Sequence, residues 1–304
     1  MHRFPLAVVS GLALWLAFPS HDLWVMAPIG VALLALATRG ASPWQGALLG
    51  LVSGLSCFLP LLTWSGIYVG ALPWIALAVL ESLYIALLGL VCALLQRGGF
   101  RRRFKRDVPT TGAAEVRPMV VALAWVAQET LRGNTPFGGF PWGRLAFSQA
   151  DSPLSALAAL GGAPAVTFGV GLAGGLLAGG LAQLTRRTEL AGGSPAGLPG
   201  IPPRGVLRRG PVAAPSLVSA VAVVLLPLLV PIPTDGPTAR FLAVQGNVPR
   251  PGLDFNAERR AVLDNHARAT EQVAAAVKAG EQPRPDLVVW PENASDIEIG
   301  RAHV

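Results

Sequence analysis

Long apolar stretches separated by short polar breaks occupy most of the first 232 residues. Seven of these stretches are candidate membrane-spanning helices, since a helix of about 20 apolar residues crosses the roughly 30 Å hydrocarbon core of a bilayer. They cover residues 4–19, 23–38, 44–64, 71–96, 119–131, 163–184 and 212–230. The pattern predicts a multi-span α-helical membrane bundle over residues 1–232, in which the first, second and fifth helices are short for that thickness.

A different pattern follows the last apolar stretch. Residues 240–245 and 286–290 are typical of short strands, and residues 256–279 carry apolar positions at helical spacing among charged ones. A strand–helix–strand unit predicts two parallel neighbouring strands, and we expect the second to be buried. So small a unit cannot cover both faces of its sheet, so we expect residues 233–298 to begin a larger α/β domain.

Composition and charge support the membrane interpretation. The chain is 52% hydrophobic and 13% charged, whereas a soluble domain carries about 25% charged residues. The net charge of +7 would also suit a nucleic-acid-binding protein. The basic residues gather in two loops, at 97–117 and 186–209, as they do in cytoplasmic loops of membrane proteins. We therefore expect no nucleic-acid partner, a cytoplasmic N-terminus, and an outward-facing segment after residue 230.

Few polar residues lie inside the predicted spans. Cys57 and Cys92 are expected to pack there as small apolar side chains. Glu81 is an intramembrane acid, which is either functional or engaged in a helix-packing hydrogen bond. Glu129 and Arg132 have the spacing of a local ion pair on one helix. The 4 histidines do not have metal-ligand spacing, and we expect neither a metal nor a cofactor.

Residues 137–144, Phe-Gly-Gly-Phe-Pro-Trp-Gly-Arg, interleave aromatic side chains with glycine and proline. They lie between the fifth and sixth predicted spans, on the outer side. One interpretation is an aromatic anchor at the membrane interface. The other is a lid or portal over a lipid site, in which Phe140 and Trp142 contact the substrate.

The second predicted strand ends at Pro291 and Glu292. Open α/β sheets place their active sites at the carboxyl ends of strands. A partly desolvated carboxylate there is suited to general-base catalysis, although a solvated acid at a strand end is the alternative. Residues 245–249, Gln-Gly-Asn-Val-Pro, follow the first strand and predict a tight turn with its glycine at a permissive position.

The chain resembles the apolipoprotein N-acyltransferases, bacterial membrane enzymes of the nitrilase superfamily. The resemblance rests on the early apolar spans and on four motifs whose order and spacing agree. These motifs are Trp-Val-Ala-Gln-Glu-Thr-Leu-Arg-Gly at 125–133, Gly-Phe-Pro-Trp at 139–142, Val-Gln-Gly-Asn-Val-Pro at 244–249 and Val-Val-Trp-Pro-Glu at 288–292. It implies a nitrilase-like (carbon-nitrogen hydrolase) fold for the domain that begins at residue 233.

The resemblance also implies a chemistry. The family carries a Glu–Lys–Cys triad in an outward-facing domain, and the matching glutamate is Glu292. It would take the proton of the cysteine thiol, which accepts an acyl chain from a phospholipid as a thioester. The lysine would stabilise the oxyanion, and the N-terminal amine of a diacylglyceryl-cysteine on an apolipoprotein would collect the chain. We assign substrate contacts to Phe140, Trp142, Gln245 and Asn247, in a monomer of the bacterial cytoplasmic membrane.

The chain departs from the family pattern near its end. The family's lysine and cysteine follow the glutamate, whereas Lys278 precedes it and Cys57 and Cys92 lie in predicted spans, so none of these takes either role. Residues 253–255 stand where the family often has a tryptophan, and a final span is missing. Residues 299–304 match a translated sequencing adapter and are interpreted as a non-native tail. We therefore expect a truncated, inactive N-terminal fragment.

Two other functions stay open. A membrane-tethered nitrilase-like amidase acting on a small carbon–nitrogen substrate would share Glu292. A transporter or membrane scaffold with a small outer domain would instead depend on intramembrane Glu81.

Overall fold

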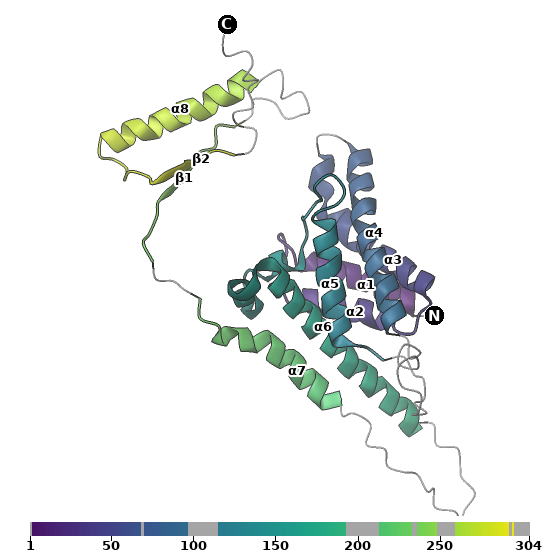
Figure 1. The fold of residues 1–304 in the computed structure, drawn as a ribbon. Coiled ribbons are helices and arrows are strands. Elements are labelled where there is room, and N and C mark those ends of the chain that lie inside the picture. The colour runs from purple at the N-terminus through teal and green to yellow at the C-terminus, as the bar shows by residue number, and fades with distance from the viewer. Residues whose placement is uncertain are drawn as a thin grey trace, which may run out of the picture. The chain divides into compact units, whose positions relative to one another are not determined.

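The computed structural model describes residues 2–67, 70–96, 115–192, 213–232, 236–247, 259–291 and 294. These residues form two compact units. One contains the helices α1 to α7, and the other contains a strand, a helix and a strand (Figure 1).

Each apolar stretch predicted from the sequence overlaps a helix of the first unit. The helices are α1 (Arg3–Leu16), α2 (Met26–Thr38), α3 (Pro43–Leu61), α4 (Ala71–Leu95), α5 (Pro118–Arg132), α6 (Ala158–Gly192) and α7 (Ala213–Leu225). Short 3-10 helices lie between or beside them: η1 (Thr63–Gly66), η3 (Leu145–Gln149), η4 (Pro153–Leu157) and η5 (Leu226–Leu229).

Three helical stretches of the described residues are long and apolar enough to cross a membrane. They are Pro43–Leu61, Ala71–Leu95 and Pro153–Thr185. The stretches Arg3–Leu16, Met26–Thr38 and Ala214–Leu229 are apolar but shorter. The protein is therefore a helical membrane protein, and the number of its crossings stays a prediction.

Local sequence explains where two of these helices begin. At the start of α3, the Ser42 hydroxyl accepts a hydrogen bond from the Gln45 amide, and the Gln45 side chain accepts one from the Ser42 amide. This reciprocal capping box satisfies amides that have no partner inside the helix. Helix α6 is interrupted at Gly161 and Gly162, where Gly162 has a φ of +62°. The predicted helix of residues 163–184 thus begins after this break.

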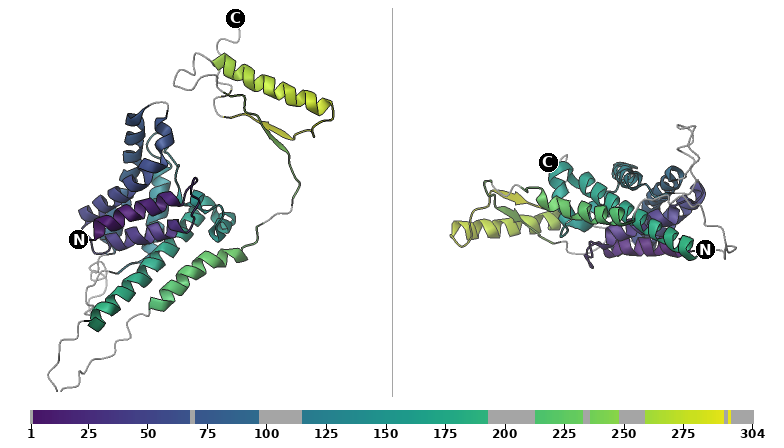
Figure 2. Two further views of the ribbon diagram at one scale, coloured as in Figure 1. Left: turned by 180° about the vertical axis from the view of Figure 1, so that it is seen from behind. Right: turned by 90° about the horizontal axis from the view of Figure 1, so that it is seen from below.

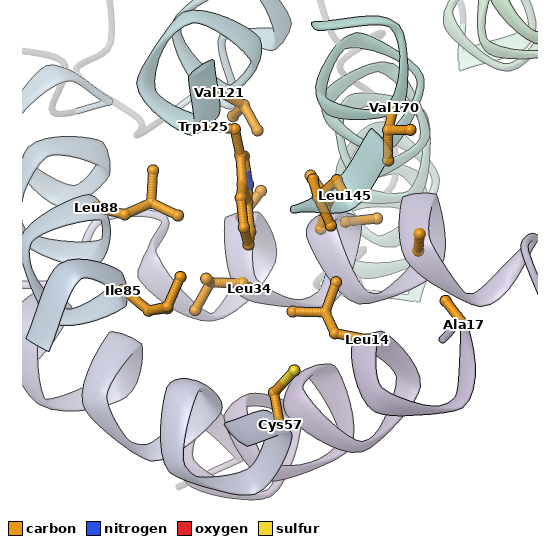
Figure 3. Packing of buried hydrophobic residues seen from close by; sticks show 14 of the residues in the cluster. Leu14, Ala17, Leu34, Cys57, Ile85, Leu88, Val121, Trp125, Leu145 and Val170 are labelled. Atoms are coloured by element: carbon orange, nitrogen blue, oxygen red, sulfur yellow. The ribbon is translucent and has the colours of Figure 1, made fainter. Parts of the chain in front are cut away.

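Apolar side chains from successive helices meet in the core of the first unit. Helix α1 packs against α2 and α3, and α6 packs against α2, α5 and α7 (Figure 2). Figure 3 shows Leu14, Leu34, Cys57, Ile85 and Trp125 converging from α1, α2, α3, α4 and α5. Both cysteines are buried and unbridged, as expected of small apolar side chains.

Glycines let α3 and α4 approach at backbone distance. Gly46, Gly50 and Gly54 lie four residues apart on α3 and therefore share one face of that helix. A Cβ built on Gly50 would lie 2.2 Å from the Ile85 carbonyl oxygen of α4, and one on Gly89 would lie 2.2 Å from the Gly46 carbonyl oxygen. Small residues are what close helix contacts in membranes require.

Substituting Gly50 with alanine should push α3 and α4 apart, because the new methyl group would overlap the Ile85 carbonyl. We expect a loss of about 1 to 3 kcal/mol, which is typical of overpacked interiors, measured as a lower thermal unfolding midpoint in detergent micelles. Gly179→Ala in α6 is the matched control, since a Cβ there meets nothing within 4 Å. The control should keep or slightly raise the midpoint, and equal midpoints would contradict the close α3–α4 contact.

The second unit contains β1 (Phe241–Ala243), α8 (Arg259–Lys278) and β2 (Leu287–Val289). The two strands pair in parallel, with Phe241 opposite Leu287, which confirms the predicted strand–helix–strand unit. The expectation of a buried second strand is wrong for this structure, because Leu287, Val288 and Val289 are 51%, 40% and 46% exposed. A two-stranded sheet with one helix leaves much of its surface uncovered.

Candidate functional site

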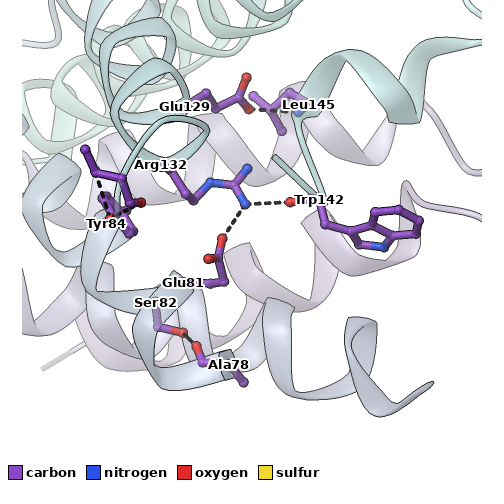
Figure 4. A network of polar contacts seen from close by, with 9 residues as sticks. Ala78, Glu81, Ser82, Tyr84, Glu129, Arg132, Trp142 and Leu145 are labelled. Atoms are coloured by element: carbon purple, nitrogen blue, oxygen red, sulfur yellow. Dashed lines mark hydrogen bonds and ion pairs between the residues drawn. The ribbon is translucent and has the colours of Figure 1, made fainter. Parts of the chain in front are cut away.

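A buried ion pair joins α4 to the end of α5. The Arg132 Nη1 atom donates to Glu81 Oε2 over 2.6 Å, and both side chains are 1% exposed (Figure 4). The predicted local pair between Glu129 and Arg132 is therefore wrong. Arg132 extends toward the acid of the neighbouring helix, whereas Glu129 bonds to other elements. Glu81 makes the helix-packing contact that was one of its two interpretations.

Glu129 links α5 to two other elements. Its Oε1 atom accepts a 2.8 Å hydrogen bond from the Leu145 amide at the start of η3. Its Oε2 atom accepts a 2.7 Å hydrogen bond from the Thr167 hydroxyl of α6. The spacing of residues along the chain did not indicate these partners. The signal in the sequence was a carboxylate on a mostly apolar helix, which requires partners when buried.

The aromatic loop, defined as residues 133–144, folds back on the end of α5. The Phe140 amide donates to the Arg132 carbonyl over 3.0 Å, and Arg132 Nη1 donates to the Trp142 carbonyl. Gly138, Gly139 and Gly143 have φ values of +96°, +79° and +69°. Glycine adopts such left-handed conformations without steric cost, so the loop can turn sharply there.

The loop places Trp142 beside an apolar pocket. Its carbonyl faces Arg132, while its indole ring points away from the polar network (Figure 4). The indole lies 5.4 Å from the Trp64 ring and 6.3 Å from the Phe140 ring, between centroids. Phe140 also packs against the apolar core. Of these two predicted contact residues, Trp142 is in the lining of the pocket and Phe140 is not.

The aromatic pocket has a volume of about 440 Å³. Its lining includes Trp15, Phe18, Leu61, Trp64, Trp142 and Phe147. Pockets of about 300–1,000 Å³ with mostly apolar walls are typical of small-molecule sites. The arrangement is suited to an apolar ligand such as a hydrocarbon chain.

Two predicted contact residues lie in the second unit, after β1. Gln245 and Asn247 are both exposed. The predicted turn needs a correction, because Asn247 and not Gly246 has the left-handed conformation, with a φ of +65°. Gly246 is required for a different reason, since a Cβ there would lie 2.5 Å from the His266 amide nitrogen of α8.

The strand end before the predicted catalytic glutamate is tied to α8. The Trp290 Nε1 atom donates to the Thr270 hydroxyl over 3.0 Å, and its ring lies 5.7 Å from the His266 ring. Glu292 itself lies outside the described residues, as do residues 253–255 and 299–304. Its role as a base, and its distance from Gln245 and Asn247, stay predictions.

Helices that can cross a bilayer, with a buried polar cluster and an aromatic pocket, define a helical membrane protein with an apolar pocket. A family model described as the apolipoprotein N-acyltransferase N-terminal domain matches residues 10–176. The chain therefore belongs to the apolipoprotein N-acyltransferase family, as its motifs predicted. The match includes the polar cluster and all the residues that line the aromatic pocket.

Proteins named apolipoprotein N-acyltransferase from three bacteria are similar to nearly the whole chain. The one from Mycolicibacterium smegmatis is 41% identical over 300 residues, which are 96% of this chain and 46% of that protein. The one from Photobacterium profundum is 27% identical, over 96% of this chain and 50% of that protein. The one from Geobacter metallireducens is 30% identical, over 95% of this chain and 51% of that protein. The chain spans about half the length of these relatives.

Glu129→Met should destabilise the bundle, because it removes the acceptor of the Leu145 amide, a buried group that can only donate. We expect a loss of about 1 to 3 kcal/mol, the cost of a buried polar group left unsatisfied, measured by thermal unfolding in micelles. Gln128→Met is the matched control on the preceding residue. The buried Gln128 amide has no hydrogen-bond partner among the described residues, so its removal should be neutral or stabilising. A greater loss in the control would contradict these assignments.

Proposed function

We propose that this chain, with any continuation that its gene encodes, transfers an acyl chain from a phospholipid to an apolipoprotein. The acceptor is the N-terminal amine of the diacylglyceryl-cysteine. The observation that carries the proposal is the aromatic pocket of about 440 Å³ in a helix bundle of this family. An apolar pocket among helices that can cross a bilayer suits a lipid hydrocarbon chain better than a small polar amide.

The proposed chemistry has two half-reactions. The Glu292 carboxylate takes the proton of a cysteine thiol, and the thiolate sulfur attacks the ester carbonyl carbon of the phospholipid. A lysine stabilises the negative oxygen of the tetrahedral intermediate. The ester C–O bond breaks, and the proton goes to the lysophospholipid oxygen. The acceptor amine then attacks the thioester, an amide forms, and the thiol is restored.

Residues that follow Glu292 in the gene would supply the cysteine and the lysine. Lys278 precedes the glutamate on α8, and Cys57 and Cys92 are buried in the helix bundle. Expressed alone, residues 1–304 should therefore show no acyl transfer. In this proposal the site lies on the outer face of the cytoplasmic membrane. Basic loops of membrane proteins are usually cytoplasmic, and the predicted spans then put the segment after residue 230 on the other side.

Glu292→Gln in the whole gene product should lower acyl transfer by about 10² to 10⁴-fold, the usual contribution of a general base. The measurement is the mass of a lipoprotein N-terminal peptide from membranes that contain no other acyltransferase. Exposed Glu281→Gln in the same unit is the matched control and should keep full activity. Unchanged transfer by Glu292→Gln would refute the assignment.

The same preparations separate the two alternatives from the proposal. Turnover of a small amide that needs Glu292 but no lipid would favour a membrane-tethered amidase. Loss of function on substitution of Glu81 but not of Glu292 would favour a transporter or scaffold.

Trp142→Ala should weaken phospholipid binding, because it removes an aromatic wall of the pocket. We expect KM for the phospholipid to rise about tenfold with kcat changed much less, since the indole contacts a non-reacting part of the substrate. Trp44→Ala is the matched control, as Trp44 is 81% exposed at the start of α3. A fall in kcat without a change in KM would argue against a binding role for Trp142.

A further inference from the structure

Two side chains of α5 hold the end of the aromatic loop and the residue that follows it. Arg132 Nη1 donates to the Trp142 carbonyl, and Glu129 Oε1 accepts from the Leu145 amide. Closer to the start of the loop, the Tyr84 hydroxyl of α4 donates to the Thr135 carbonyl over 2.7 Å. The backbone of Trp142 is thus fixed by a charged group that belongs to α5.

The position of that charged group depends on Glu81. Arg132 is 1% exposed, and a guanidinium so deeply buried is stable only when it is paired. Glu81 is its carboxylate partner, and the Phe58 ring lies 5.3 Å from the guanidinium carbon. The Arg132 Nε atom has no hydrogen-bond partner among the described residues. Glu81 is therefore the group that holds Nη1 where it reaches the Trp142 carbonyl.

Without Glu81 of α4, the carboxylate of Glu129 on α5 would compete for Arg132. Glu129 lies one helical turn before Arg132, and its two oxygens already accept from Leu145 and Thr167. An Arg132 side chain drawn toward Glu129 would leave the Trp142 carbonyl and disturb the Leu145 contact. Both ends of the loop segment would be released by the loss of one charge.

We propose that Glu81 is a positioning residue of the aromatic pocket, which it controls through Arg132. The Glu81–Arg132 pair fixes the backbone of Trp142, and the backbone places the indole against Trp64 on the pocket wall. The effect is local, since the loop contains glycines at φ values of +96°, +79° and +69° and can adopt other conformations once released. This role does not require that the protein transfer acyl chains.

Amide hydrogen exchange of the Glu81→Gln variant in micelles tests the proposal. Glutamine keeps the shape of the side chain and removes its charge. Peptides covering residues 139–147 should exchange about tenfold faster, whereas peptides from α1 and α2 stay within twofold. Exposed Glu115→Gln is the matched control and should change neither region. Unchanged exchange at 139–147, or an equal increase across the bundle, would overturn the proposal.

A charge exchange separates positioning from simple packing. Glu81→Arg combined with Arg132→Glu restores an opposite pair, but a carboxylate at position 132 cannot donate to the Trp142 carbonyl. We expect the unfolding midpoint to recover above that of Glu81→Gln while residues 139–147 stay in fast exchange. Recovery of slow exchange in the loop would mean that the pair only packs helices, and the proposal would fall.

A milder variant decides the question if the charge exchange does not fold. Glu81→Asp keeps the negative charge on a side chain one methylene shorter. The loop should exchange less than threefold faster than wild type, clearly below Glu81→Gln. If Glu81→Asp speeds exchange in the loop as much as Glu81→Gln does, a negative charge at position 81 is not sufficient to hold the loop, and the positioning role is refuted.

Discussion

The cost of burying charge governs how the end of α5 is organised. Removing a carboxylate or a guanidinium from water costs several kcal/mol unless partners replace the lost hydration. Around Arg132 and Glu129, those partners come from α4, from α6, from the backbone of the aromatic loop and from the backbone at the start of η3. No one of these elements supplies all the partners, so the two charges of α5 require neighbours from four different elements. The arrangement of the loop follows from that requirement.

Apolar packing positions the helices that carry this polar cluster. Dispersion and the burial of apolar surface bring helices together but specify little about their rotation. The glycines at 46, 50 and 54 give α3 a flat face that α4 can approach at backbone distance. This contact holds α4 where the Glu81 carboxylate is within reach of the Arg132 side chain. It also holds the end of α3 beside Trp142, where both line the pocket. The walls of the aromatic pocket thus come from segments held by two kinds of contact, which are close backbone packing at glycines and buried polar bonds to the loop.

The sequence predicted the elements better than their partners. Apolar stretches located the helices, and two short strand-like segments on either side of an amphipathic segment located the parallel strand–helix–strand unit. The sequence did not predict the partner of Arg132. The i,i+3 spacing with Glu129 is visible along the chain, whereas Glu81 is 51 residues away. Helix α4 is apolar on nearly every side, so periodicity does not tell which face meets α5. The left-handed backbone of Asn247 was missed for a related reason. The sequence suggested that Gly246 makes the turn, whereas Gly246 is needed for the close approach to α8, which is not visible along the chain.

The exposed strands of the second unit have a practical consequence. In the described part of the chain, β1 and β2 form a two-stranded sheet, and each strand has one side that no other strand pairs. Unpaired backbone donors and acceptors next to exposed Leu287, Val288 and Val289 are a template for the addition of further strands. In a larger sheet, those edges would be where the next strands join. In a chain of this length handled at high concentration, the same edges favour self-association, so detergent that disperses the helices would not by itself keep the protein monodisperse.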